Sequence, residues 1–157
     1  MSFNASCLCG SVRFSTKARP VYSAYCHCSE CRKFSGSGHS AFIGVSFDRL
    51  NFNPGSEQYL GTYPKTQKTT MVFCNRCGSS LMAHKLDSGM AHVRLGCIDT
   101  PVPLMPMGHL HCSSAALWET LPDDNLPRLD TVPRVEGASS LTSRPGPRPV
   151  SDGEPAP

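Results

Sequence analysis

The sequence lacks the segments that would carry a protein into or across a membrane. Its first residues, MSFNASCLCGSVRF, do not contain the basic start and continuous apolar stretch of a secretory signal peptide. The longest uncharged run in the first 121 residues, 100–118, contains three prolines and two histidines, which exclude a transmembrane helix. We therefore expect a cytoplasmic protein with no membrane partner.

The chain also lacks a complete disulfide framework and a strong charge of either sign. Its nine cysteines are an odd number, so internal disulfides cannot pair all of them. A cysteine-rich chain without a secretory signal more often binds metal than forms disulfides. The formal net charge is only +3, and no basic arm is present, so we expect no nucleic-acid partner.

Aromatic residues are missing from the C-terminal part of the chain. Residues 122–157 hold eight of the 14 prolines, but none of the 12 aromatic residues and none of the cysteines. Such a segment has little apolar surface to offset the entropy lost on folding. We predict one zinc-binding domain over residues 1–129 and a Pro-rich disordered tail over residues 130–157.

The first part of the chain is predicted to be rich in β-strands. Short apolar or β-branched runs are separated by Gly, Pro, Asn and Ser at hairpin-like intervals, which is typical of small antiparallel sheets. The runs are Ser11–Thr16, Val21–Tyr25, Ser40–Val45, Gln58–Tyr63, Thr69–Phe73, Leu81–Ala83, His92–Leu95 and Gly108–Leu110. Helical periodicity is weak and allows only single turns at 30–34 and 46–50. A domain built this way has a thin core and gains from metal cross-links.

Seven cysteines fall into three tight clusters. A C-x-x-C-Gly knuckle aims two thiolates at one ion, a C-x-C pair can supply two more, and a C-x-C-x-x-C cluster supplies three by itself. The clusters are Cys7 with Cys9, Cys26 with Cys28 and Cys31, and Cys74 with Cys77. A closed four-thiolate site is structural, whereas a three-thiolate site with an exchangeable position is typical of catalysis. We therefore expect two zinc ions per chain.

The spacing leaves alternatives open. The knuckle could instead share a metal with part of the middle cluster. His27, His39 or His109 could fill the vacant position, although His27 lies between two ligands and should point away from the metal. Cys97 and Cys112 are expected to be buried thiols, and Cys97 could approach the site. Seven thiolates and two zinc ions would bring the formal charge from +3 to zero.

Several segments together carry a resemblance to a known family. They are CLCGSVRF at 7–14, CHCSECRKFSGSGHSAF at 26–42, FCNRCGSSL at 73–81, GCID at 96–99, Pro106 with His109, Trp118, and Leu126 with Pro127. The chain resembles the glutathione-dependent formaldehyde-activating enzyme and centromere protein V family over about residues 4–129.

The resemblance implies a mainly β, Mss4-like fold of stacked antiparallel sheets cross-linked by zinc, with few helical turns. It assigns a structural zinc to Cys7, Cys9, Cys74 and Cys77, and a catalytic-type zinc to Cys26, Cys28 and Cys31. The family's named activity joins formaldehyde to glutathione, giving S-hydroxymethylglutathione, and so implies a carbon–sulfur lyase with a small thiol substrate. The alternative is a zinc-stabilised binding module without catalysis, as the centromere-protein and Mss4 resemblances allow.

The chain departs from the family pattern at one position. The family often has a basic residue two positions before the knuckle, where this chain has Met71, and Lys65 or Lys68 could replace it. Proton transfer would need a nearby acid or base. Asp99 and His109 are the candidates, although Asp99 could equally cap a turn and His109 could simply hydrogen-bond within a strand.

Three further features near the middle cluster each have two interpretations. The turn Gly36–Gly38 could bring backbone amides close to a ligand carboxylate, or could simply be a flexible turn. Arg32 and Lys33 could steer an anionic thiol peptide, or could only solvate the surface. Trp118 is expected to anchor the core rather than to stack on a ligand.

Overall fold

The computed structural model describes residues 2–103 and 105–131, and the part of the predicted tail beyond residue 131 lies outside them. The strands are β1 (Phe3–Ser6), β2 (Arg13–Thr16), β3 (Tyr22–Cys26), β4 (Ser40–Ser46), β5 (Asn51–Phe52), β6 (Leu60–Thr66), β7 (Thr69–Cys74), β8 (Ser80–Lys85), β9 (Met90–Arg94), β10 (His109–Leu110) and β11 (Arg128–Leu129). The helix is α1 (Ser29–Ser35), and the 3-10 turns are η1 (Phe47–Arg49), η2 (Glu57–Tyr59), η3 (Leu95–Cys97) and η4 (Cys112–Ser114). None of the described helices is both long and apolar enough to cross a membrane.

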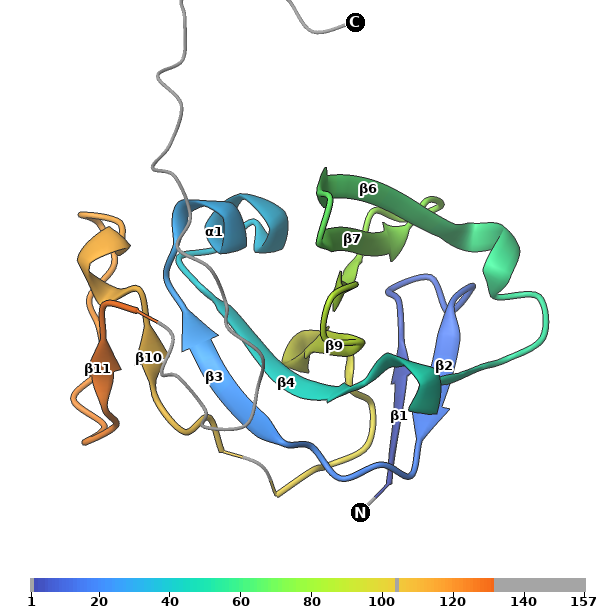
Figure 1. Cartoon of the computed structure of the whole chain (residues 1–157), viewed down its shortest axis with the longest axis horizontal. Coiled ribbons are helices and arrows are strands. Elements are labelled where there is room, and N and C mark those ends of the chain that lie inside the picture. Colours follow the sequence, from blue (N-terminus) through green and yellow to red (C-terminus); the bar gives the residue numbers. More distant parts are fainter. Residues whose placement is uncertain (1, 104, 132–157) are drawn as a thin grey trace, which may run out of the picture.

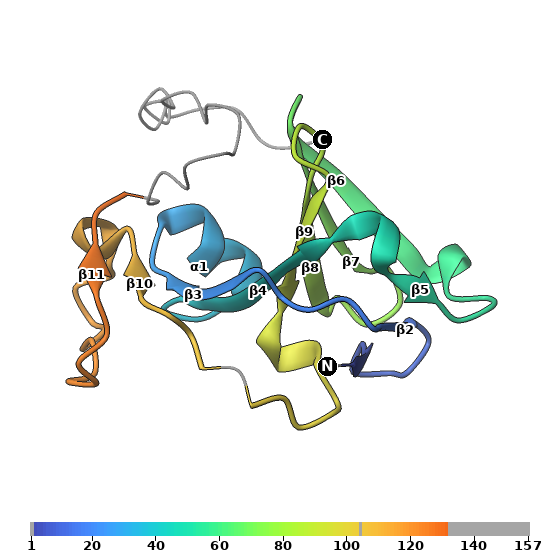
Figure 2. The same ribbon diagram turned by 60° about the horizontal axis from the view of Figure 1, so that its bottom comes forward.

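The strands form two sheets, which confirms the predicted mainly β fold (Figures 1 and 2). The smaller sheet has the order β1-β2-β5, and the larger has the order β11-β10-β3-β4-β9-β8-β7-β6. The neighbours are antiparallel except at β10, which runs parallel to both β3 and β11. The chain reaches β10 through the long connection after η3 rather than through a hairpin, so β10 can enter the sheet parallel to β3.

The main core lies between the two sheets. In β2, buried Phe14 and Thr16 alternate with more exposed residues, so one face of this strand is directed inward. β4 is buried at most positions because it lies in the middle of the larger sheet. The core includes Phe3, Val12, Phe14, Ile43, Val45, Leu81, Met82 and Val93.

Most of the predicted elements are present. The sequence did not predict three of the strands, and the prediction that Trp118 anchors the core is wrong. All eight predicted strand regions contain or overlap an observed strand, whereas β1, β5 and β11 are additional. The predicted turns at 30–34 and 46–50 correspond to α1 and η1. Trp118 is not a core anchor, because it is 72% exposed and its segment packs inward through the smaller side chain of Ala116.

Candidate metal centres and the adjoining cavity

The first cysteine cluster joins the two sheets. Cys7 and Cys9 come from the loop between β1 and β2, Cys74 ends β7, and Cys77 lies in the turn after it; all four sulfur atoms lie within 4.8 Å of one another. The Cys7 and Cys9 sulfurs are 3.5 Å apart, and those of Cys9 and Cys74 are 3.9 Å apart. Tetrahedral zinc with Zn–S bonds of about 2.3 Å separates its sulfurs by about 3.8 Å. The four cysteines therefore fit a closed zinc site.

Two glycine turns shape this cluster. Gly10 and Gly78 have φ values of 73° and 77°, a conformation that glycine adopts without a steric cost. Their backbone amides donate to the carbonyls of Cys7 at 3.0 Å and Cys74 at 2.8 Å, which closes each turn around a pair of sulfurs. The Val12 amide also donates to the Cys7 sulfur at 3.2 Å.

Hydrogen bonds favour the thiolate form at two positions of this cluster. The Ser79 side chain is the main cause that lowers the pKa of Cys77 to about 5, and the Ser11 side chain is the main cause that lowers the pKa of Cys9. In contrast, burial raises the pKa of Cys74 to about 11. Because zinc binds thiolates, the contacts with Ser11 and Ser79 prepare the more accessible sulfurs, and the buried sulfur would lose its proton on metal binding.

The second cluster lies where β3 meets α1. Cys26 ends β3, Cys28 is the N-cap of α1, and Cys31 lies in its first turn; their sulfurs lie within 4.8 Å of one another. The Cys28 sulfur lies 3.6 Å from the Cys26 sulfur and accepts from the Cys31 amide at 3.4 Å. These contacts lower the pKa of Cys28, with the Cys26 thiol as the main cause, and raise that of Cys26 in return. Among the described residues, no fourth His, Cys, Asp or Glu joins this group.

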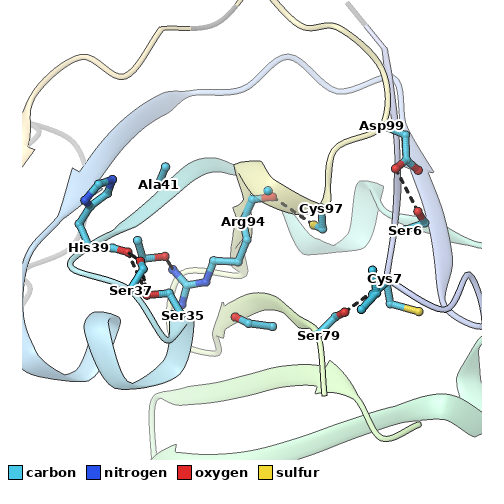
Figure 3. A pocket seen from close by; sticks show the side chains of 14 residues that line it. Ser6, Cys7, Ser35, Ser37, His39, Ala41, Ser79, Arg94, Cys97 and Asp99 are labelled. Atoms are coloured by element: carbon cyan, nitrogen blue, oxygen red, sulfur yellow. Dashed lines mark hydrogen bonds between the residues drawn. The ribbon is translucent and has the colours of Figure 1, made fainter. Parts of the chain in front are cut away.

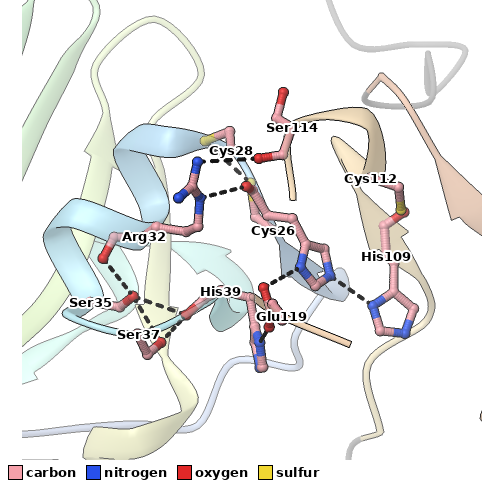
Figure 4. Close-up of polar contacts among 11 residues, drawn as sticks. Cys26, Cys28, Arg32, Ser35, Ser37, His39, His109, Cys112, Ser114 and Glu119 are labelled. Atoms are coloured by element: carbon pink, nitrogen blue, oxygen red, sulfur yellow. Dashed lines mark hydrogen bonds and ion pairs between the residues drawn. The ribbon is translucent and has the colours of Figure 1, made fainter. Parts of the chain in front are cut away.

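The histidines that were candidates for the vacant position belong to a separate group (Figure 4). His27 is fully buried, and burial is the main cause that lowers its pKa. The two carboxylates of the group contact imidazole nitrogens: Glu119 contacts His27 and His39, and Asp124 contacts His109. The His27 Nε2 and His109 Nδ1 atoms are 2.9 Å apart. His109 therefore lies in a buried network rather than among the sulfurs.

A cavity of about 660 Å³ extends between the first cluster and the region around α1 (Figure 3). Its lining includes Cys7, Ser80, Arg94 and Asp99. Arg94 is only 6% exposed and donates to the Ser40 hydroxyl at 2.7 Å. Its Nε and the Ser80 hydroxyl have no hydrogen-bond partner among the described residues. A buried guanidinium that lines a cavity of this size gives the cavity a positive charge, which favours an anionic ligand.

Arg94 also connects the cavity with the second cluster. Burial lowers the pKa of its guanidinium, and the neighbouring thiols of Cys31 and Cys26 oppose that shift. Its backbone carbonyl accepts from the Cys97 thiol at 3.1 Å, and burial raises the pKa of Cys97 to about 12. Cys97 is therefore a protonated, buried thiol outside both clusters, whereas Cys112 is half-buried.

The remaining predicted residues have varied surroundings. Asp99 lines the cavity, and one of its oxygens accepts from the Ser6 hydroxyl at 3.0 Å. The Arg32 guanidinium donates to the carbonyls of His27 and Ser114, both at 3.3 Å, and thereby ties α1 to the loop after β10.

Two predicted features remain: Met71, at the position of the missing basic residue, and the turn after α1. Met71 is buried, and Lys65 forms an ion pair with Glu30 on α1. In the turn after α1, Ser37 lines the cavity, and Gly36 caps the helix with a φ of 68°.

Arg94 and Glu119 are the residues of this region that the sequence reasoning missed. A single arginine between apolar residues in the segment VRL is a weak signal for a buried cation with an anionic partner. No comparable signal surrounds Glu119, which reaches His27 from 92 positions away in the chain.

Comparisons with known proteins concern the family and the fold of the chain. A family model described as glutathione-dependent formaldehyde-activating enzyme matches residues 2–114. The crystal structure of a Rhodobacter sphaeroides protein, a structural genomics target, has a TM-score of 0.53 and 17% sequence identity, and the match covers 64% of this chain and 91% of that chain. At this identity the likeness shows the fold alone. No curated protein matches the chain.

Proposed function

The chain belongs to the glutathione-dependent formaldehyde-activating enzyme family, and on that premise we propose that it is a zinc-dependent carbon–sulfur lyase-type enzyme. Its substrate would be a small anionic thiol–aldehyde adduct such as S-hydroxymethylglutathione. The observation that carries the proposal is the buried guanidinium of Arg94, which lines the cavity and interacts with Cys31 of the second cluster. This arrangement offers a cation for the substrate beside a set of sulfur ligands.

The two cysteine clusters would hold the metal. We assign the structural zinc to Cys7, Cys9, Cys74 and Cys77, and the catalytic-type zinc to Cys26, Cys28 and Cys31. These three thiolates would hold a zinc ion with one exchangeable position, which would supply Lewis-acid chemistry to an oxygen of the substrate. Three thiolates donate strongly, which suits an easy reaction such as the reversible addition of a thiol to an aldehyde.

The side chains of the cavity would bind the substrate and move its proton. The Arg94 guanidinium lines the cavity and would attract an anionic group of the substrate. Asp99 lines the same cavity and is our candidate for accepting the thiol proton and returning it to the product. His109 is only 2% exposed and has both ring nitrogens in hydrogen bonds, so it could exchange a proton with a substrate only through His27.

The binding-module alternative would be favoured by a fourth protein ligand in the second cluster and by the absence of a cavity. Within residues 2–103 and 105–131, no fourth ligand joins the three sulfurs, and the cavity is present. The missing fourth ligand supports the enzyme. The cavity is connected with the second cluster through Arg94, because none of the three cysteines of that cluster lines it. The cytoplasmic location and the absence of a nucleic-acid partner stay predictions.

The proposal is tested by NMR exchange spectroscopy of formaldehyde with glutathione, with and without the zinc-loaded protein. The uncatalysed reaction is itself fast, so exchange rates rather than end points must be compared. We expect the protein to raise the exchange rate above that of the same buffer. An unchanged rate with fully zinc-loaded protein would contradict the proposed activity.

A substitution of Arg94 tests the substrate class. Losing a charge-assisted hydrogen bond costs about 1.5–3 kcal/mol, so Arg94→Met should lower the protein-dependent rate with glutathione by roughly 10- to 100-fold. The effect should be much smaller with 2-mercaptoethanol, which has no carboxylate. Arg49→Met, at an exposed position, is the matched control and should change neither rate. Equal losses with both thiols would show that Arg94 has only a structural role.

A further inference from the structure

A second kind of ligand set lies close to the sulfur clusters. His27 follows β3, His39 precedes β4, and Glu119 follows η4, yet their ligand atoms lie within 4.8 Å of one another. Figure 4 shows the His39 and Glu119 side chains close to each other. Two imidazoles and one carboxylate are a known ligand set of zinc sites with an open position.

The distances within this set are compatible with a bound ion. The His27 Nδ1 atom lies 3.3 Å from Glu119 Oε2, and the His39 Nδ1 atom lies 2.6 Å from Glu119 Oε1. Nitrogen and oxygen ligands about 2.0–2.2 Å from a tetrahedral zinc lie about 3.3 Å from each other. The first pair already has this separation. The second pair would have to lengthen, and the His39 side chain is 39% exposed, so it has room to move.

The hydrogen bonds of His27 Nε2 and of the His109 ring indicate whether His27 Nδ1 carries a proton. His27 Nε2 lies 2.9 Å from His109 Nδ1, and His109 Nε2 lies 3.0 Å from Asp124 Oδ2. If each ring is neutral, His27 Nε2–H donates to His109, and His109 Nε2–H donates to Asp124. This leaves His27 Nδ1 as a bare lone pair facing Glu119. A cation between His27 and Glu119 satisfies that lone pair, whereas a hydrogen bond there would require an extra proton on the buried pair.

The same chain of contacts is the usual support of a metal-binding histidine. Such a histidine normally donates its second ring N–H to a fixed acceptor, which orients the ring and raises its basicity. Here His109 is that acceptor, and Asp124 fixes His109 in turn. His27 and His109 are 0% and 2% exposed, so both rings are held firmly.

A glycine makes room for the carboxylate. A Cβ atom at Gly38 would lie 2.6 Å from both carboxylate oxygens of Glu119, well inside van der Waals contact. Glu119 can therefore approach the imidazoles only because residue 38 has no side chain.

We propose that His27, His39 and Glu119 form a third metal site that binds Zn²⁺ through two nitrogens and a carboxylate. His39 also lines the 660 Å³ cavity, so the open position of this ion would lie beside the cavity. The site shares no ligand residue with the sulfur clusters and does not rest on the proposed lyase activity.

The test compares bound metal in the full-length, zinc-loaded wild type and variants, measured by mass spectrometry of the metal after gel filtration. Glu119→Gln and Gly38→Ala should each bind one zinc ion fewer than the wild type. Gly38→Ala keeps all three ligand residues and displaces only the carboxylate. Glu57→Gln, at an exposed position, is the matched control and should bind as many ions as the wild type. Equal zinc contents in Glu119→Gln and wild type would overturn the proposal.

Cobalt absorption identifies the ligands independently of activity. Co²⁺ added to protein whose sulfur sites are filled should give ligand-field bands without new thiolate-to-cobalt charge-transfer bands. These bands should be absent in Glu119→Gln. New charge-transfer bands would place the added ion on sulfur and would overturn the proposal, whatever the outcome of the formaldehyde assay.

Discussion

Removing one sulfur from each cysteine cluster should destabilise the protein to different extents, because the clusters connect different lengths of chain. The first cluster brings Cys9 and Cys74 together, 65 positions apart, and ties the loop of the smaller sheet to the larger sheet. In the second cluster, Cys28 lies two positions from Cys26 and three from Cys31, so a metal there connects only β3 and α1.

The difference can be worked out from the entropy of loop closure. A cross-link that closes a loop of 65 residues stabilises the folded state by about 4 kcal/mol, and the same relation gives about 2 kcal/mol for a loop of about five residues. Cys74→Ser should therefore lower the free energy of unfolding by about 2 kcal/mol more than Cys28→Ser. In a domain of this size, that difference corresponds to roughly 8 °C in Tm.

The measurement is urea and thermal unfolding of the zinc-loaded protein under reducing conditions, followed by circular dichroism. Cys112→Ser is the control, because Cys112 lies outside both clusters, and it should change the free energy of unfolding by less than about 1 kcal/mol. If Cys28→Ser were as destabilising as Cys74→Ser, the division into a structural and a local site would be wrong. If Cys74→Ser were already unfolded at 25 °C, its loss in free energy of unfolding would be larger than expected but would agree with the same division.

Three further predictions follow from the core and the metal sites. Burial lowers the pKa of His92 to about 3, so its neutral form is favoured in the folded state. The contribution of His92 to the free energy of unfolding should be fully present above about pH 6.5, and about 2 kcal/mol of it should be lost at pH 5. In His92→Gln, the free energy of unfolding should fall less over the same acid titration. Gly44→Ala places a Cβ atom inside van der Waals contact with the Tyr22 ring, 2.6 Å from its Cε1 atom, and should cost about 1–3 kcal/mol in urea unfolding; the Tyr22 hydroxyl contacts His92. A strong chelator should abolish cooperative thermal unfolding, and restoring zinc should recover it.

The cysteine groups were predictable from the sequence because most of their geometry is local. Spacings of two or three residues fix which sulfurs can approach one ion, and glycines such as Gly78 provide the turn. Ligand number allowed the two distant cysteine pairs to share one tetrahedral site but left another partition open, and the family resemblance selected between them. Strands with several alternating residues were predictable for the same reason, since alternation is a property of neighbouring residues.

The missed features depend on contacts between distant residues. Glu119 meets His39 from 80 positions away, and no pattern around either residue indicates this. β5 and β11 contain two residues each, too few for an alternation to be recognised. The parallel direction of β10 depends on the path of the connection before it, and composition does not specify that path.

The charge of the second cluster explains why a buried arginine lies between it and the cavity. Three thiolates and one divalent ion have a net charge of −1, which would repel an anionic thiol substrate. Opposite unit charges 4 Å apart attract by about 4 kcal/mol at an effective dielectric constant of about 20. The Arg94 guanidinium interacts with Cys31 and lines the cavity, so this cation reduces the repulsion between the metal cluster and an anionic substrate. A neutral residue at position 94 would therefore weaken the binding of an anionic substrate, whereas Arg94→Lys should preserve the charge and lose the directed hydrogen bonds.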